Sequence, residues 1–550
     1  MYPHQEEGFE FLWKNIAGGI ELNNMNNDDI GGCVISHAPG TGKSFLTIAF
    51  LRSYMEVFKD CRPVIVAPSS MLLTWEEEFK KWGVDIPFHN LSSKDLSGKE
   101  EEWACNMIQS TSQNTNWIRM IKLLSWSKNM SILGISYSLF EKLTGQRSAK
   151  SNAKGGNIKS ANEAEEIKRI LLEKPSLLVL DEGHTPRNKD SCIWKALENV
   201  KTRRRIILSG TPFQNNFEEL YNTLYLVRPK FAERFGKGVW DSLTRSIGKH
   251  ENKQILDKIR ALINPFVHSY KGSILKENLP GLRGCVMVLN PLPLQRDLLE
   301  RVNEEKVKLT REHAVSVVSV HPSLLMCCKF SGLEKYSTYA IAAKNSWLDP
   351  DQGVKTRFLI ELIRLCEVLK EKVLVFSQYV KPFNLIKDQL KQVFRWTEGD
   401  EVLQMSGKLR VKRRQSIINA FNDPCSKARV LLASIKTSSE GINLVGASRI
   451  VLLDIVWNPA VERQAISRAY RLGQKKVVYA YHLLTSGTLE EDKYDRQVKK
   501  DQLGELVFSK TDGANEKDQP VICNDRVLEA MIESNKFRDS FKEFVYQLKE

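Results

Sequence analysis

Short apolar runs separated by longer amphipathic stretches dominate this sequence, and this alternating pattern occurs in two separate parts of the chain. Runs of Val, Ile and Leu that are too short for a helix are typical of strands buried in a parallel sheet. In the first part of the chain they lie at 32–36, 63–68, 131–136, 177–180 and 205–208. They restart at 373–376, 430–433, 450–453 and 477–480. Because crossover helices join such strands, we predict an α/β fold with two lobes, each built on a parallel sheet.

The segment between these two parts, at 231–352, has more sequence patterns that are typical of helices. We therefore predict a first lobe at 1–230, a helical protrusion and linker at 231–352, a second lobe at 353–510 and a helical C-terminal extension at 511–550. The polar run 148–165 is predicted to be a disordered insertion in the first lobe.

Charge and composition narrow the class of protein. The 550 residues include 81 Lys and Arg against 66 Asp and Glu, a net charge of +15. This excess favours a polyanionic partner such as nucleic acid, although a generally basic surface would give the same number. No apolar run approaches the roughly 18 residues of a membrane span, so we expect no membrane partner. The ten cysteines lack CxxC pairs, which favours a reducing compartment, the cytosol or the nucleus.

A glycine-rich turn follows the first apolar run and leads into a helical pattern. The turn contains Pro39, Gly40, Thr41, Gly42, Lys43 and Ser44. A strand, a glycine turn and a helix in this order predict a phosphate-binding loop rather than an ordinary turn. We expect backbone N–H groups near Gly40 and Gly42 to cradle phosphates, and Lys43 to reach the terminal phosphates. Ser44 would coordinate Mg²⁺. His37 stands where the common pattern has its first glycine.

An acidic pair, Asp181 and Glu182, ends the run at 177–180. Charged residues often end strands for structural reasons. Together with the phosphate loop, however, the pair indicates one carboxylate on the metal and one that activates water. We predict that Asp181 binds Mg²⁺ and that Glu182 is the catalytic base.

Two later segments could complete this chemistry. The polar turn at 209–216 follows a strand and could sense the γ-phosphate. Arg468 and Arg471 are spaced to share one face of a predicted helix, from which two guanidinium groups could enter a nucleotide site as arginine fingers. A solvated basic face is the alternative.

Taken together, the motifs resemble the Snf-type ATPases of helicase superfamily two, which translocate on double-stranded DNA and remodel chromatin. The resemblance covers nearly the whole chain and implies two RecA-like lobes joined through a helical protrusion, with ATP and Mg²⁺ as cofactors. It implies that Gln5 reads adenine and that Gly441 and Gln464 belong to the nucleotide site. It also implies coupling between ATP and DNA through His184, Ser209, Thr211 and Gln214.

The same resemblance implies residues that contact the DNA backbone. In the first lobe they are Ser69 and Trp75. In the second lobe they are Gln378, Lys408, Lys436 and Ser438. Such contacts would be independent of sequence and sensitive to salt.

Three segments, 181–188, 456–459 and 469–471, look most like the plant CLASSY group, which is linked to RNA-directed DNA methylation. Members of that group associate with the plant RNA polymerase Pol IV, which starts small-RNA production. We therefore expect a nuclear protein with double-stranded DNA or chromatin, and Pol IV, as partners. CLASSY members carry a long N-terminal region, and we interpret this chain as a fragment, a short paralogue or an incomplete gene model.

The expected function is that of an ATP-driven motor on double-stranded DNA that supports polymerase recruitment in gene silencing. Two alternatives remain at this point. One is a recruitment scaffold that keeps the ATPase fold with little turnover, and the other is a helicase that unwinds the duplex.

Overall fold

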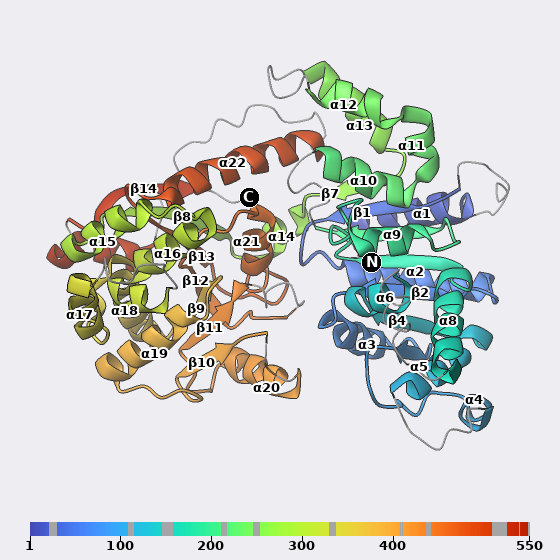
Figure 1. Ribbon diagram of the computed structural model, residues 1–550, viewed down its shortest axis with the longest axis horizontal. Helices are drawn as coiled ribbons and strands as arrows, with labels where there is room; N and C mark the ends of the chain where they lie inside the picture. Colours follow the sequence, from blue (N-terminus) through green and yellow to red (C-terminus); the bar gives the residue numbers. More distant parts are fainter. Residues whose placement is uncertain are drawn as a thin grey trace. The chain divides into compact units, whose positions relative to one another are not determined.

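Two compact units make up the chain. A computed structural model describes residues 1–20, 30–107, 115–145, 158–210, 217–245, 253–328, 337–407, 409, 411–435, 442–508, 525–537 and 539–547. Met1–Ser273 lies in the first unit, and the second unit begins at Ile274. Figure 1 colours the elements of the first unit from blue to green and those of the second from yellow-green to red.

The first unit is built on a seven-stranded sheet in the order β3-β4-β2-β5-β6-β1-β7. All neighbouring strands run parallel. The strands are β1 (Cys33–His37), β2 (Pro63–Ala67), β3 (Phe88–Asn90), β4 (Ile132–Ser136), β5 (Leu177–Asp181), β6 (Arg205–Ser209) and β7 (Val267–Tyr270). Every residue of β1, β2, β4, β5 and β6 is buried, because helices cover both faces of a parallel sheet.

One helix precedes these strands, and the others lie between them. They are α1 (Pro3–Ala17), α2 (Lys43–Val57), α3 (Met71–Lys81), α4 (Glu102–Met107), α5 (Thr115–Lys128), α6 (Tyr137–Thr144), α8 (Ile158–Glu173), α9 (Cys192–Glu198), α10 (Phe217–Val227), α11 (Pro229–Phe235), α12 (Lys237–Arg245) and α13 (Lys253–Ile263). Side-chain caps fix several starts: the Ser136 hydroxyl accepts a hydrogen bond from the Leu139 N–H and begins α6 directly after β4.

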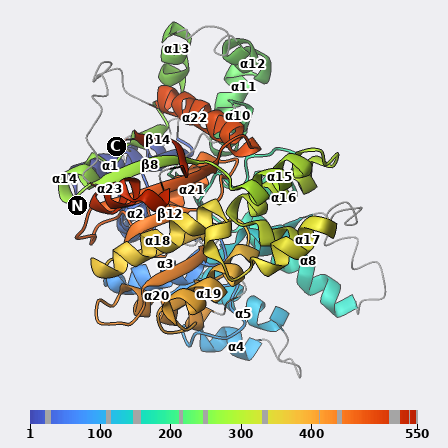
Figure 2. The same cartoon turned by 90° about the vertical axis from the view of Figure 1, so that its left-hand side faces the viewer.

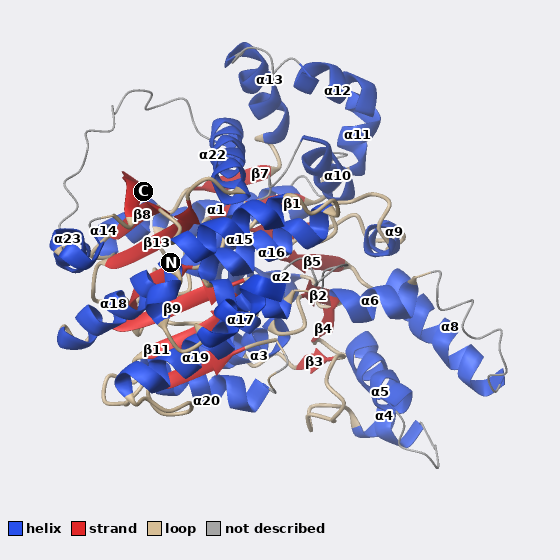
Figure 3. Ribbon diagram, turned by 60° about the vertical axis from the view of Figure 1, so that its left-hand side comes forward, coloured by secondary structure: helices blue, strands red, loops and turns tan. Residues whose placement is uncertain are grey.

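The second unit also contains a seven-stranded sheet, in the order β10-β11-β9-β12-β13-β8-β14. Its strands are β8 (Leu282–Leu289), β9 (Lys372–Ser377), β10 (Val402–Met405), β11 (Val430–Ser434), β12 (Ala447–Leu452), β13 (Val478–Thr485) and β14 (Phe541–Gln547). All neighbours are parallel except β14, which pairs antiparallel with β8. Figure 3 shows the strands of this sheet in red with α18, α19 and α20 beside them.

The helices of the second unit are α14 (Ser273–Asn278), α15 (Pro293–Asn303), α16 (Lys308–Val320), α17 (Ser337–Asn345), α18 (Val354–Val368), α19 (Lys381–Phe394), α20 (Val411–Asn422), α21 (Pro459–Ile466), α22 (Leu489–Phe508) and α23 (Arg526–Glu533). The short 3₁₀ turns are η1 (Pro322–Cys327), η3 (Pro350–Gln352) and η5 (Asn535–Phe537). Among the described residues, no helix is both long and apolar enough to cross a membrane.

Strand β9 shows how this sheet separates two cores. Val373 and Val375 pack into the core that contains Phe358 of α18, whereas Leu374 and Phe376 pack into the core that contains Phe421 of α20. Successive side chains of a strand point to opposite faces, so an unbroken apolar run supplies both cores. Figure 2 shows α18 and α19 from the side of the first of these cores.

A buried ionic cluster attaches the C-terminal segment to the second sheet. The Arg449 guanidinium on β12 contacts the Asp525 carboxylate, the Tyr481 hydroxyl and the Glu371 carboxylate. Asp525 in turn caps α23 by accepting a hydrogen bond from the Val527 N–H. Removing one partner would leave a buried charge uncompensated, so the cluster fixes where this segment lies.

The predicted α/β fold with two parallel sheets is confirmed, but the linking region differs from its prediction. Segment 231–352 is divided between the units, since β7 completes the first sheet and β8 belongs to the second. The C-terminal extension contains the strand β14 as well as a helix. Within 148–165, the helix α8 begins at Ile158, and residues 146–157 lie outside the described part.

Candidate nucleotide site

The predicted phosphate loop joins β1 to α2. Gly40 and Gly42 have φ values of 84° and 88°, in the left-handed region that favours glycine. A Cβ atom on Gly42 would lie 2.4 Å from the Gln5 amide nitrogen, so a side chain here would displace the Gln5 amide. Gly42 precedes α2 without a side-chain cap, as expected where backbone N–H groups serve an anion.

Lys43, the first residue of α2, folds back over the loop. Its ammonium donates hydrogen bonds to the backbone oxygens of His37 at 2.8 Å and Ala38 at 3.3 Å. The Thr41 hydroxyl donates to the Ala38 oxygen at 2.7 Å and closes the turn. The loop is therefore shaped by its own contacts, with the half-buried Ser44 next to the lysine.

Two side chains of helix α1 form hydrogen bonds with the phosphate loop. The Gln5 amide nitrogen donates to the Thr41 oxygen at 3.1 Å, and its amide oxygen accepts from the Tyr2 N–H at 3.0 Å. His4 Nε2 also contacts the Thr41 oxygen, at 3.0 Å. The structure thus brings Gln5 to the phosphate loop, while its reading of adenine stays a prediction.

Asp181 ends β5 and is almost fully buried. Its Oδ2 accepts a hydrogen bond from the Trp75 indole at 2.9 Å, and its Oδ1 accepts one from the Glu182 N–H at 3.0 Å. Burial and the neighbouring Glu182 carboxylate raise the pKa of Asp181 to about 6, against the opposing effects of Trp75 and Lys43. The carboxylate is therefore mainly ionised at neutral pH.

Glu182 has an unusual backbone. Its φ of 48° lies in the left-handed region, where non-glycine residues are rare and strained. The Gly183 N–H donates to the Leu208 oxygen at 3.0 Å, and a Cβ atom on Gly183 would lie 2.6 Å from Ile207. Strand β6 thus fixes the turn that carries the Glu182 carboxylate.

Two of the predicted coupling residues lie beside this carboxylate. His184 Nδ1 is 3.5 Å from Glu182 Oε2 and 3.5 Å from the Ser209 hydroxyl at the end of β6. Burial and Arg187 lower the pKa of His184 to about 4, so the imidazole is neutral at physiological pH. Thr211 and Gln214 lie outside the described residues.

The prediction that Trp75 contacts DNA is corrected by the structure. Its side chain is 1% exposed, on the buried face of α3, and its indole N–H is bonded to Asp181. A side chain without surface cannot contact a phosphate, so Trp75 positions the acidic pair instead. Ser69, at the end of β2, is exposed, as a surface contact would require.

In the second unit, the predicted DNA contact Gln378 follows β9. Its amide nitrogen donates to Asp454 Oδ1 at 3.2 Å and to the Ile455 oxygen at 3.1 Å. A primary amide has two hydrogens, and both point into the protein. The remaining amide oxygen is an acceptor, which a phosphate oxygen would repel, so in this arrangement the side chain offers phosphate no donor, and a DNA contact at Gln378 stays a prediction. Lys408, Lys436, Ser438 and Gly441 lie outside the described residues.

The predicted helical face of Arg468 and Arg471 is also corrected. Helix α21 ends at Ile466, and both arginines lie in the irregular turn that follows. The Arg471 guanidinium is 3.5 Å from the Ile442 oxygen, and the Arg468 oxygen accepts from the Leu444 N–H at 2.8 Å. Gln464, near the end of α21, is buried.

Comparison with protein families matches residues 4–330 to the SNF2-related domain and residues 354–473 to the helicase conserved C-terminal domain. The chain belongs to the SNF2-related family. The first match alone covers more than half of the chain, and the two matched domains are those of a DNA-dependent ATPase of helicase superfamily two. The predicted Snf-type resemblance is thereby confirmed.

Two curated relatives in a plant agree with this family. SNF2 domain-containing protein CLASSY 3 of Arabidopsis thaliana is 53% identical, over 100% of this chain and 41% of its own length. CLASSY 4 of the same plant is 47% identical, over 100% of this chain and 48% of its own. The chain thus spans less than half the length of these two relatives. The solved SWI2/SNF2 ATPase core of Sulfolobus solfataricus in complex with dsDNA is 21% identical over 92% of this chain and 93% of that chain, with a TM-score of 0.37.

One feature of this SNF2-related chain was missed by sequence reasoning. His37 Nε2 lies 2.8 Å from His268 Nδ1 on β7, and the His4 ring stacks on Tyr270 at 4.0 Å. These contacts tie the phosphate loop to α1 and to the edge strand of the sheet. The one available signal was the histidine that stands in place of the loop's first glycine.

Proposed function

We propose that this chain is an ATP-driven motor that moves along double-stranded DNA or chromatin. We further propose that it acts in the nucleus, in RNA-directed DNA methylation, by supporting recruitment of Pol IV for small-RNA production. The single observation that carries the ATPase proposal is the gathering of Lys43, Asp181 and Glu182 at the carboxyl ends of β1 and β5, strands that only β6 separates. In open parallel sheets, ligands bind at this edge.

The residues present fit ATP and Mg²⁺. The left-handed glycines Gly40 and Gly42 and the start of α2, which no side chain caps, suit the approach of phosphate oxygens to the backbone. Each oxygen of the ionised Asp181 carboxylate keeps a lone pair after accepting its one hydrogen bond from the protein. We assign the metal to Asp181 and Ser44, where bound Mg²⁺ would neutralise developing phosphate charge.

The chain's own residues supply the remaining steps. Lys43 exchanges its contacts with the loop carbonyls for phosphate oxygens, which its ammonium pairs with as a point charge. Glu182 accepts the proton of the attacking water, and its fixed left-handed backbone keeps the carboxylate oriented. His184 and Ser209 lie in position to report the state of that carboxylate, and we place Thr211 and Gln214 in the same coupling role.

The second unit is proposed to complete the site and to grip DNA. Arg468 and Arg471 would stabilise the negative charge of the transition state, next to Gln464 and Gly441. Ser69 in the first unit, and Lys408, Lys436 and Ser438 in the second, are proposed as contacts to the DNA backbone. Gln5 is proposed to recognise adenine.

Steady-state ATP hydrolysis tests the motor. The purified chain is assayed with and without double-stranded DNA at two salt concentrations, beside Lys43→Ala and Glu182→Gln. Glu173→Gln, which changes an exposed carboxylate on α8, serves as the matched control. Duplex should stimulate hydrolysis, salt should weaken the stimulation, and both site variants should abolish it. Normal turnover in either site variant would overturn the assignment.

The alternatives give different results in related assays. A scaffold would bind ATP and Pol IV while hydrolysing little, and Lys43→Ala would leave the association with Pol IV intact. An unwinding enzyme would release a labelled strand from the duplex, whereas a translocase would displace a bound triplex strand without separating the duplex.

A further inference from the structure

Asp454, two residues beyond β12, accepts the hydrogen bonds that hold the end of β9 and the turn after it. Its carboxylate accepts the Ser377 hydroxyl at 2.5 Å and the Gln378 N–H at 3.0 Å, besides the Gln378 amide. The Ser377 hydroxyl in turn accepts the Tyr379 N–H at 3.0 Å. Ser377, the last residue of β9, and the next two residues are therefore held, directly or through Ser377, by one carboxylate that is 1% exposed.

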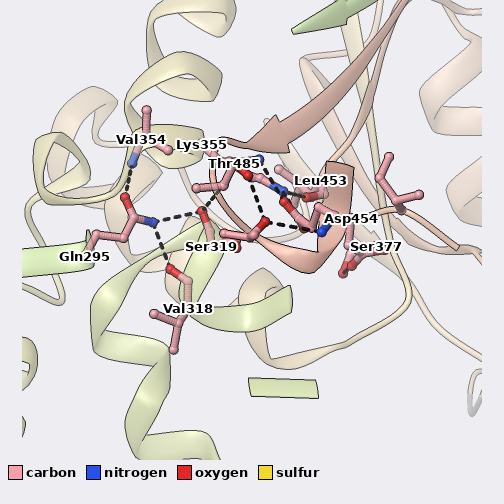
Figure 4. A network of polar contacts seen from close by, with 12 residues as sticks. Gln295, Val318, Ser319, Val354, Lys355, Ser377, Leu453, Asp454 and Thr485 are labelled. Carbon is pink, nitrogen blue, oxygen red and sulfur yellow. Dashed lines mark hydrogen bonds and ion pairs between the residues drawn. The ribbon is translucent and has the colours of Figure 1, made fainter. Parts of the chain in front are cut away.

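A buried ion pair lies next to this carboxylate. The Lys355 ammonium, at the start of α18, donates to the Leu453 oxygen at 2.7 Å and to the Glu490 carboxylate at 2.8 Å. Figure 4 shows Lys355 beside Leu453. Burial raises the pKa of Asp454, while the donors of the turn and the Lys355 charge oppose that effect. The positive charge thus helps to keep Asp454 ionised as an all-acceptor group.

The network continues into the helical segment before α18. Gln295 on α15 accepts the Val354 N–H at 3.1 Å and donates to the Val318 and Ser319 oxygens at the end of α16 (Figure 4). The polar groups that hold the turn all have partners, and satisfied buried groups fix one geometry. The turn after β9 therefore has a single shape, imposed from the carboxyl ends of the central strands.

We infer that Asp454 and Gln378 act as one unit of positioning residues that sets the turn after β9 for duplex binding, with Gln378 making no phosphate contact of its own. This inference rests on the proposed function, since it supposes that the turn engages DNA. It changes the role proposed for Gln378 from a contact with DNA to support of the turn after β9. It also adds Asp454, for which the sequence predicted no role.

A double-mutant cycle tests the inference. Binding of a fluorescein-labelled duplex by anisotropy without nucleotide, and duplex-stimulated ATPase, are measured for Asp454→Asn, Gln378→Ala and the double variant. Loss of a hydrogen bond to a charged group should weaken duplex affinity roughly tenfold in each single variant. The double variant should lose no more than either single one, because the two residues support the same turn. The KM for ATP, measured for the same variants without duplex, separates a loss at the turn from a loss of the nucleotide site.

Lys372→Met is the matched control. Lys372 is buried at the start of β9, the end of that strand opposite Ser377. Its ammonium donates to the Phe421 and Asp423 backbone oxygens. Lys372→Met should lose about as much thermal stability as the Asp454 and Gln378 variants but keep its duplex affinity. That result would separate positioning of the turn from general destabilisation of the unit. Equal loss of duplex affinity in Lys372→Met would overturn the inference.

Other outcomes of these experiments distinguish failure of the inference from failure of the proposed motor. Additive losses, roughly hundredfold in the double variant, would show that Gln378 contacts DNA independently and would overturn the inference. Wild-type duplex binding without ATP hydrolysis would overturn the motor alone, and the anisotropy cycle would still decide about Asp454. A wild-type chain that binds no duplex would overturn both.

Discussion

The indole nitrogen of Trp75 donates a hydrogen bond to the carboxylate of Asp181 at 2.9 Å, across 106 positions of sequence. It is one of only two hydrogen bonds from the described residues that the carboxylate accepts, and it opposes the rise in the pKa of Asp181. An apolar helix face thus contributes to the acidic pair of the nucleotide site.

Trp75→Phe should therefore lower the kcat for ATP about tenfold, because a donor to a charged group is lost; the smaller ring also leaves a cavity, whose effect on stability a thermal melt measures. Trp82→Phe is the control. Trp82 directly follows α3, is 41% exposed and donates to Glu78 at 2.7 Å. Equal rates for Trp75→Phe and wild type would show that Asp181 needs no support from the indole.

Gly42→Ala should weaken ATP binding at least about tenfold, since the new methyl group meets Gln5 and the residue keeps a left-handed φ. Gly83→Ala, in the turn after α3, carries a similar φ of 62° with no atom near the new methyl group, and so controls for backbone strain outside the loop. Titration with a fluorescent ATP analogue measures both. If Gly42→Ala binds ATP as tightly as Gly83→Ala, neither the contact with Gln5 nor the left-handed φ of Gly42 shapes the ATP site.

Arg471→Ala should leave ATP affinity nearly unchanged and lower turnover about 10³-fold or more, as expected for a residue that stabilises the transition state. Lys475→Ala, at an exposed position in the same segment, should have no effect. Single-turnover hydrolysis and equilibrium binding separate the two steps. A large loss of affinity with normal turnover of bound ATP would contradict the arginine-finger role.

His321 should make the second unit less stable in acid. Its Nδ1 accepts the Ser323 N–H and its Nε2 donates to the Asp349 oxygen, so the neutral ring is fully bonded. Burial lowers its pKa from 6.5 to about 4. Below pH 6.5 the unfolded chain therefore binds a proton that the folded chain does not, and stability falls until about pH 4.

His321→Asn keeps a side-chain oxygen for the Ser323 N–H but cannot titrate. Between pH 7.5 and 5.0, the loss in free energy of unfolding should be smaller in this variant by about 2 kcal/mol. Urea unfolding followed by tryptophan fluorescence at the two pH values measures the difference. The other histidines are common to both proteins, so identical pH dependence would mean that His321 titrates normally in the folded chain.

Much of the architecture and the nucleotide loop could be predicted because their signals are local. Five strands of the first sheet and four of the second were visible as apolar runs, and the strand, glycine turn and helix around Lys43 are continuous in sequence. The pair Asp181 and Glu182 was found for the same reason. The two arginines were placed on a helix because their spacing suits one, yet α21 ends at Ile466.

The sequence by itself determined two parallel-sheet lobes, a phosphate loop and an acidic pair, since strand periodicity, glycine conformation and neighbouring residues act over a few positions. Only the tertiary structure decided which groups Trp75, His37 and Gln378 contact. Their partners Asp181, His268 and Asp454 lie 106, 231 and 76 positions away. A buried donor takes whichever acceptor the folded chain brings to it, and that choice depends on packing that no local pattern records.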